Sequence, residues 1–103
     1  MNARNILLLL LPVFGFVAAC ATSKNYDPEF NAAPQDVQSD WPMTRERCSQ
    51  CHSLERVFEY VDASTNRDEI EMMVEDMAGR KKSKIEDAEI PRIVQVLDWH
   101  RQK

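Results

Sequence analysis

The sequence has very little glycine, the residue that tight turns between β-strands most often require. Only two of its 103 residues are glycine, Gly15 and Gly79, and no alternating run of β-branched residues lies between hairpin-type turns. Apolar residues instead recur at spacings of three, four and seven, which is the pattern of amphipathic helices. The sequence therefore predicts an all-α fold.

No apolar run is long enough to cross a bilayer as a helix. The longest spans residues 6–19 and is interrupted by a proline and a glycine, whereas a spanning helix needs about 20 apolar residues. This run follows Arg4 and ends in small residues, which is the pattern of an export signal. We interpret residues 1–19 as a signal peptide.

The chain also lacks an excess of positive charge. Without the signal peptide, 12 basic side chains remain against 17 acidic ones, which is a formal balance of −5. Nucleic-acid binding needs a concentrated positive surface, so the composition argues against nucleic acid as a partner. The one basic cluster is Arg80-Lys81-Lys82-Ser83-Lys84. It either steers an acidic redox partner or is a solvated loop.

Three cysteines are an odd number for a simple disulfide framework. One of them, Cys20, directly follows the signal, and Val17-Ala18-Ala19-Cys20 resembles the lipobox of bacterial lipoproteins. The resemblance implies cleavage before Cys20 and a membrane anchor of lipid on that residue, on the periplasmic side. Ala21 in place of Asp resembles outer-membrane sorting in Gram-negative bacteria. An ordinary secretory signal with an incidental cysteine is the alternative.

Residues 20–40 are polar, contain two prolines and show no sustained apolar period. This composition predicts a flexible tether that stretches to roughly 65 Å. One small domain, residues 41–103, follows it. Three helical regions are predicted there: residues 39–61, residues 64–79, and residues 83–101, the last with a short turn before a helix from Pro91 to Arg101.

The pentapeptide Cys48-Ser49-Gln50-Cys51-His52 is a C-x-x-C-H sequence, the attachment signal for c-type haem. In this motif two thiols three residues apart bind the porphyrin, and the following imidazole ligates the iron. A thioredoxin-like redox pair is an alternative, but it needs a βαβ scaffold. A zinc site is a second alternative, but zinc needs two further Cys or His ligands.

From Trp41 onward the chain resembles the small monohaem cytochromes of the class I cytochrome c type. The resemblance rests on a helix leading into C-x-x-C-H, a later methionine and a closing amphipathic helix. It implies a bundle of about three helices around one covalent haem c, with a methionine sulfur as the second axial ligand of the iron. It also implies single-electron transfer between redox partner proteins and no enzymatic activity.

Met77 is our choice for that second ligand, because it ends the apolar face of the second helix, just before Gly79. Val74-Glu75-Asp76-Met77 also resembles a V-x-x-M segment that carries the ligand in several small bacterial cytochromes. Met73 lies on the same face and stays an alternative ligand. The other possible ligands are Met43, Met72 and His100, and an iron with no second protein ligand is a further alternative. Arg56, four residues after His52, is a candidate partner for a haem propionate, or else a solvated side chain.

The leading hypothesis is a mobile electron carrier tethered to a membrane. A haem-bearing subunit of a larger membrane oxidoreductase is the second hypothesis. A gas-binding haem sensor, with no protein ligand on one side of the iron, is the third.

Overall fold

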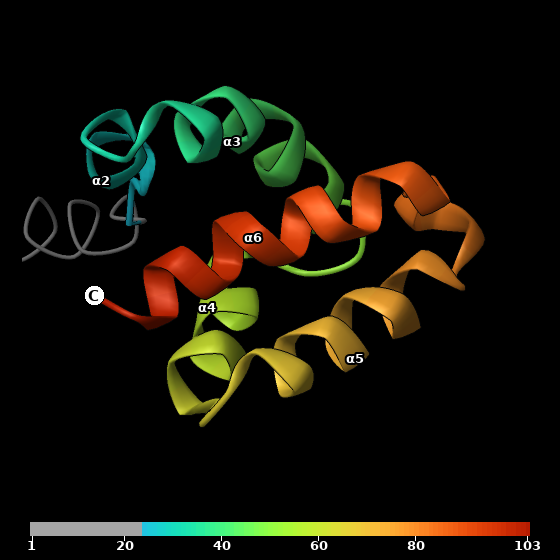
Figure 1. The fold of residues 1–103 in the computed structure, drawn as a ribbon. Coiled ribbons are helices and arrows are strands. Elements are labelled where there is room, and N and C mark those ends of the chain that lie inside the picture. Colours follow the sequence, from blue (N-terminus) through green and yellow to red (C-terminus); the bar gives the residue numbers. More distant parts are fainter. Residues whose placement is uncertain (1–23) are drawn as a thin grey trace, which may run out of the picture.

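The structure is a computed structural model, and it describes residues 24–103. In that part of the chain there is no β-strand. The elements are five α-helices and two one-turn 3₁₀ helices: α2 (Asp27–Asn31), α3 (Gln35–Cys48), α4 (Leu54–Ala63), α5 (Arg67–Ala78), η1 (Lys81–Ser83), η2 (Asp87–Glu89) and α6 (Ile90–Arg101). The predicted all-α class is confirmed, with more helices than the three regions predicted (Figure 1).

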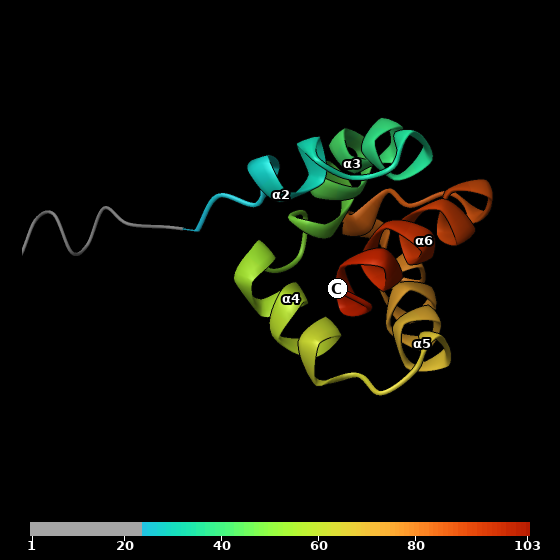
Figure 2. The same ribbon diagram turned by 60° about the vertical axis from the view of Figure 1, so that its left-hand side comes forward.

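The C-terminal helix α6 is the centre of the packing. It lies between α3 and α5 in both views and also contacts α4 (Figure 1 and Figure 2). Four of its apolar side chains are buried: Ile93, Val94, Val96 and Leu97. Pro91 lies in its first turn, where the missing N–H costs nothing, and the predicted helix from Pro91 to Arg101 is confirmed within one residue.

Side-chain caps define where α4 and α5 begin. The Ser53 hydroxyl accepts the Arg56 N–H at the start of α4, and the Asn66 side chain accepts the Glu69 N–H at the start of α5. The second predicted helix is therefore confirmed as α5, although it starts at Arg67 and not at residue 64. It ends at Ala78 with Gly79 as its C-cap, close to the predicted end.

Helix α3 differs from its prediction at both ends. It starts at Gln35, so Pro42 lies inside it and not in its first turn. Its buried side chains are spaced four, three and four residues apart: Val37, Trp41, Thr44 and Cys48. This stripe continues N-terminal to the proline and packs on α6, which outweighs the one hydrogen bond that Pro42 cannot donate. The helix then ends at Cys48, and α4 is a separate helix.

The prediction of a flexible tether over residues 20–40 is wrong for residues 26–40. Phe30 is fully buried, and its ring stacks on that of Trp41 with a centroid distance of 4.0 Å. Tyr26 is buried as well and stacks on Phe58 at 4.2 Å. Burial of two aromatic rings offsets the cost of ordering this otherwise polar segment. The folded domain thus begins near Tyr26, whereas residues 1–19 and Cys20 lie outside the described residues.

Phe30→Leu is expected to lower the free energy of unfolding by about 1 to 2 kcal/mol, because it keeps an apolar side chain but removes the ring stacked on Trp41. Urea unfolding measures this effect. Met72→Leu is the control, since the Met72 side chain is 68% exposed and its loss should change little. Equal stability of both variants would mean that α2 does not dock in solution.

Candidate functional site

The C-x-x-C-H motif occupies the turn between α3 and α4. Cys48 is the last residue of α3, and the Ser49 N–H still donates to the Arg45 carbonyl at 3.3 Å. Arg47, one residue before the motif, donates two hydrogen bonds to Glu89, at 3.1 and 3.2 Å. These bonds hold the pKa of Glu89 below its usual range, so the pair is charged at neutral pH. The motif is therefore tied to the start of α6.

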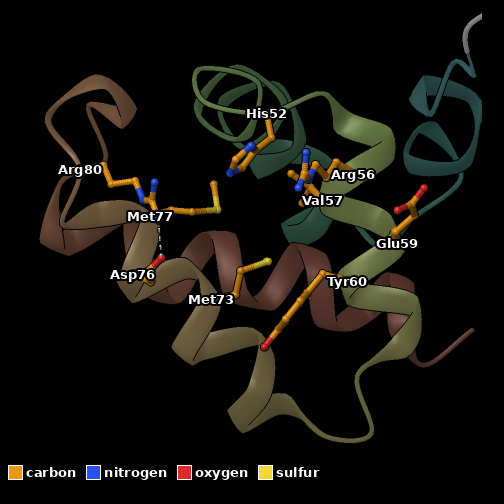
Figure 3. Close-up of a pocket in the computed structure, with 9 residues that line it drawn as sticks. All are labelled: His52, Arg56, Val57, Glu59, Tyr60, Met73, Asp76, Met77 and Arg80. Atoms are coloured by element: carbon orange, nitrogen blue, oxygen red, sulfur yellow. Dashed lines mark hydrogen bonds and ion pairs between the residues drawn. The ribbon is translucent and has the colours of Figure 1, made fainter.

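A cavity of about 380 Å³ opens beside the motif. His52 lines it from the turn before α4, and Met73 and Met77 line it from α5. Figure 3 shows the His52 ring and the Met77 sulfur pointing into the same space from opposite sides. The other wall residues are Arg56, Val57, Glu59, Tyr60, Asp76 and Arg80.

A second cavity, also of about 380 Å³, shares His52 and Arg80 with the first. Cys51 lies in its wall, together with Lys81 and Lys82 of the basic cluster. Two of the predicted haem-binding residues, Cys51 and His52, and the predicted ligand Met77 therefore surround adjoining spaces.

Cys48 is placed differently from the rest of the motif. Its side chain is fully buried in the apolar core and lines neither cavity, whereas Cys51 is half-buried. Both thiols are free, with no disulfide between them. Burial raises the pKa of the Cys48 thiol to about 12, because a thiolate is poorly solvated in an apolar core. A thioether at Cys48 therefore requires its sulfur to turn outward, or the segment covering it to open.

In haem-free protein at pH 8, iodoacetamide is expected to alkylate Cys51 far faster than Cys48. A thiol with a pKa of about 12 is ionised in about one molecule in ten thousand at that pH, and only the thiolate reacts. Peptide mapping by mass spectrometry measures each site separately. In urea both cysteines should react alike, and equal labelling without urea would contradict the burial of Cys48.

Two guanidinium groups line the first cavity. Arg56, the sequence-based candidate for a haem propionate, lines it from α4. In the sequence Arg80 stands out only as part of the basic cluster, yet it lines both cavities and pairs with Asp76 at 3.2 Å. Its spacing of three residues from Met77, one helical turn, was the available signal that the two side chains are neighbours.

The candidate iron ligands differ in whether their side chains line the first cavity. Met77 is 4% exposed, and the half-buried Met73 lines the same cavity one turn earlier. Met72 points to solvent, and Met43 packs against the core. His100 lies between two carboxylates: one ring nitrogen contacts Glu29, and the other lies 2.7 Å from Asp62.

The donor groups around these cavities fit a haem. An imidazole and a thioether sulfur face one space, which is the axial pair that holds iron in cytochromes c, and a thiol adjoins it. The two arginines suit carboxylate groups at the edge of a porphyrin. A cavity volume of about 380 Å³ falls within the range of small-molecule sites. Among the described residues, no group of three or more His, Cys, Asp or Glu is placed to hold a metal ion by itself.

Comparison with known proteins adds no identification. The chain matches no protein-family model, no curated protein and no solved structure.

Proposed function

We propose that this protein is a lipid-anchored electron carrier with one haem c. Cys48 and Cys51 hold the porphyrin, and His52 and Met77 ligate its iron. The observation that carries the proposal is the shared cavity: the imidazole that follows C-x-x-C and a buried methionine sulfur from α5 face one space from opposite sides (Figure 3). Haem, when bound, supplies a one-electron redox couple.

The residues around His52 and Met77 have separate tasks in this proposal. Val57 and Met73 form the apolar part of the cavity wall. Apolar side chains beside the iron favour the iron state of lower charge and so raise the reduction potential. Arg56 and Arg80 bind the propionates with charge-assisted hydrogen bonds.

The anchor in this proposal is the lipid on Cys20, as its resemblance to a lipobox implies. The domain then lies on the periplasmic side of a bacterial membrane. If the cell is Gram-negative, the membrane that holds the lipid is the outer membrane. Within the described residues, no helix combines the length and hydrophobicity needed to cross a membrane. The partners are redox proteins that donate and accept single electrons.

Optical spectra of the purified, matured protein test the proposal. A low-spin haem spectrum with the weak near-infrared sulfur-to-iron band supports His52 and Met77 as ligands. A shift of the reduced spectrum with carbon monoxide would favour a gas-binding sensor. Elution of the protein with other subunits in detergent would favour a haem subunit of a larger oxidoreductase. A colourless protein would refute the proposal.

The basic cluster is the proposed docking face for an acidic partner. Ser83 and Ile85 are buried, and the Ser83 hydroxyl donates to the Arg80 carbonyl at 2.9 Å, so the loop is fixed at its base. Lys81 and Lys82 are exposed and line the cavity that contains Cys51 and His52. Positive charge therefore borders the cavity of Cys51 and His52 in an otherwise acidic protein, which supports docking of an acidic partner at the proposed haem edge.

Lys81→Gln with Lys82→Gln is expected to slow bimolecular electron transfer to an acidic partner several-fold at low salt, and to flatten the dependence of the rate on ionic strength. Stopped-flow kinetics over a range of salt concentrations measures both effects. Lys24→Gln with Lys103→Gln is the charge-matched control, since Lys103 contacts Glu29 of α2 and lies away from the cavities. An unchanged salt dependence would dismiss the cluster as a docking face.

A further inference from the structure

The two cysteines of the motif lie in different surroundings. Cys48 ends the buried stripe of α3, and its side chain is fully enclosed in the apolar core. Cys51 lies past the end of that helix, in the wall of the second cavity, and is half-buried. His52 lines both cavities. A haem that enters beside His52 therefore meets the Cys51 thiol directly, whereas the Cys48 thiol is out of its reach.

The last turn of α3 holds Cys48 in the core. Within the helix end, the Ser49 hydroxyl donates to the Arg45 carbonyl at 2.7 Å, and this bond moves with the turn. Arg47 connects the turn to another helix, because its guanidinium donates to Glu89, the N-cap of α6, at 3.1 and 3.2 Å. Arg47 and Cys48 are neighbours in the same turn. An outward rotation of the turn that frees Cys48 would therefore pull Arg47 away from Glu89.

The Arg47–Glu89 pair is shielded from solvent, and its carboxylate is fixed from a second side. The Arg47 side chain is 21% exposed and the Glu89 side chain only 12%. The Glu89 carboxylate also accepts the Glu86 N–H at 3.0 Å, in the capping box of η2. A carboxylate held in this way does not follow a guanidinium that moves. Two charge-assisted hydrogen bonds in a poorly solvated position thus oppose opening of the turn.

We infer that the two thioethers form in order, at Cys51 first and at Cys48 second. The second bond waits for the last turn of α3 to open, and the Arg47–Glu89 pair controls that opening. Arg47 is thus a positioning residue for haem attachment. The inference rests on the proposed haem site. In each addition the sulfur bonds to one carbon of a vinyl group and the thiol hydrogen goes to the other carbon, so no oxidant is needed.

The first thioether makes the second step depend on the protein alone. Once Cys51 is bonded, the porphyrin stays beside the motif, and the second vinyl group has a high effective concentration near Cys48. The rate of the second step then follows the fraction of molecules in which the turn is open. Loss of hydrogen bonds to a charged group should raise that fraction, and with it the rate, by about tenfold.

Thiol labelling of the haem-free protein tests the control by Arg47 without any haem. In Arg47→Gln, iodoacetamide is expected to alkylate Cys48 about tenfold faster than in the unchanged protein, with Cys51 unaffected. Arg47→Lys keeps a positive charge beside Glu89 but loses the two-pronged bond, so its labelling rate should lie between those of the other two proteins. An unchanged rate at Cys48 in Arg47→Gln would overturn the inference.

Arg92→Gln is the matched control. Arg92 of α6 donates to Asp40 of α3 at 3.0 and 2.6 Å, so it joins the same two helices, but Asp40 lies about two helical turns before Cys48. Loss of this pair should leave the labelling of Cys48 unchanged. Equal acceleration in Arg92→Gln would mean that a general loss of stability exposes Cys48, and it would overturn the inference. Circular dichroism verifies folding; if Arg47→Gln is unfolded, the comparison of Arg47→Lys with Arg92→Gln decides.

Attachment of ferrous haem to the purified haem-free protein, under nitrogen with dithionite, tests the order. Samples are quenched with acid at intervals, and tandem mass spectrometry locates haem within the peptide that contains both cysteines. Haem on Cys51 alone should appear first. The doubly attached form should follow about tenfold sooner in Arg47→Gln than in the unchanged protein or in Arg92→Gln. Haem on Cys48 alone as the first product, or both bonds without a lag, would overturn the inference.

These outcomes separate the inference from the proposed function. If neither cysteine carries haem in this reaction or after export through a haem-attachment pathway, the proposed haem site is wrong and the inference falls with it. If both cysteines carry haem but the order or the effect of Arg47→Gln is absent, only the inference is wrong.

Discussion

The double variant Cys48→Ala with Cys51→Ala is expected to lose all covalently bound haem. Thioethers to these two residues are the only proposed covalent links, so no other side chain replaces them. After export through a haem-attachment pathway, the denatured variant should show the mass of the polypeptide alone. Its haem, where His52 and Met77 still bind it, should be extracted completely by acidified organic solvent.

Gln50→Ala is the matched control for this variant. Gln50 lies inside the motif and is exposed, but neither a thioether nor an iron ligand depends on it. It should mature with haem attached at the level of the unchanged protein. Haem that survives denaturation and extraction in the double variant would refute attachment at these cysteines. Equal loss of haem in the control would mean that the effect reflects misfolding.

Loss of the haem should also lower the thermal stability of the domain. A ligand that binds only the folded state stabilises it by mass action, and a covalent ligand is always present. A domain of about 80 residues has only a small margin of stability of its own. The melting temperature of the double variant, after extraction of its haem, should therefore lie well below that of the matured protein and close to that of haem-free protein.

The helices that the sequence predicted well carry their signals locally. Pro91, followed by apolar residues at spacings of three and four, marks the start of α6 within one residue. Gly79 marks the end of α5. In both cases the residue at the boundary has a local backbone preference, proline for the first turn of a helix and glycine for the position after its end, and this preference does not depend on tertiary packing.

Helix α2 was missed because its stability is not local. It has five residues, which is too short for a helical period to be recognised. The ring of Phe30 packs on Trp41, 11 positions further along the chain. The ring of the N-cap residue Tyr26 packs on Phe58, 32 positions further along. Polar composition then favoured a tether. The start of α3 was missed for a related reason, because Pro42 suggested a first turn while the buried stripe from Val37 shows that the helix is already established.

The individual residues of the candidate site could be predicted from the sequence, but their arrangement in space could not. C-x-x-C-H and the methionines of α5 are visible in the sequence, but only the packing of α4 and α5 around α6 brings His52 and Met77 to one cavity. The burial of Cys48 could not be seen either. Its place in the core depends on the stripe of α3 that the sequence placed wrongly.

Met77→Ala is expected to remove the sulfur-to-iron near-infrared band and to lower the reduction potential. A methionine sulfur stabilises the reduced iron, and axial ligands set haem potentials over a wide range, so the fall should be on the order of 0.1 V. The open position should then bind carbon monoxide or imidazole. Spectroelectrochemistry measures the potential and the spectrum in one experiment.

Met73→Ala is the matched control, because it removes the same side chain from the same helix and the same cavity, one turn earlier. Met77 is the more buried of the two, and Figure 3 shows its side chain directed toward His52. Met73→Ala should therefore keep the near-infrared band and change the potential by much less. If Met73→Ala loses the band and Met77→Ala keeps it, Met73 is the ligand and the cavity binds haem one turn earlier along α5. If both variants keep the band, neither sulfur ligates the iron and the proposed axial pair is wrong.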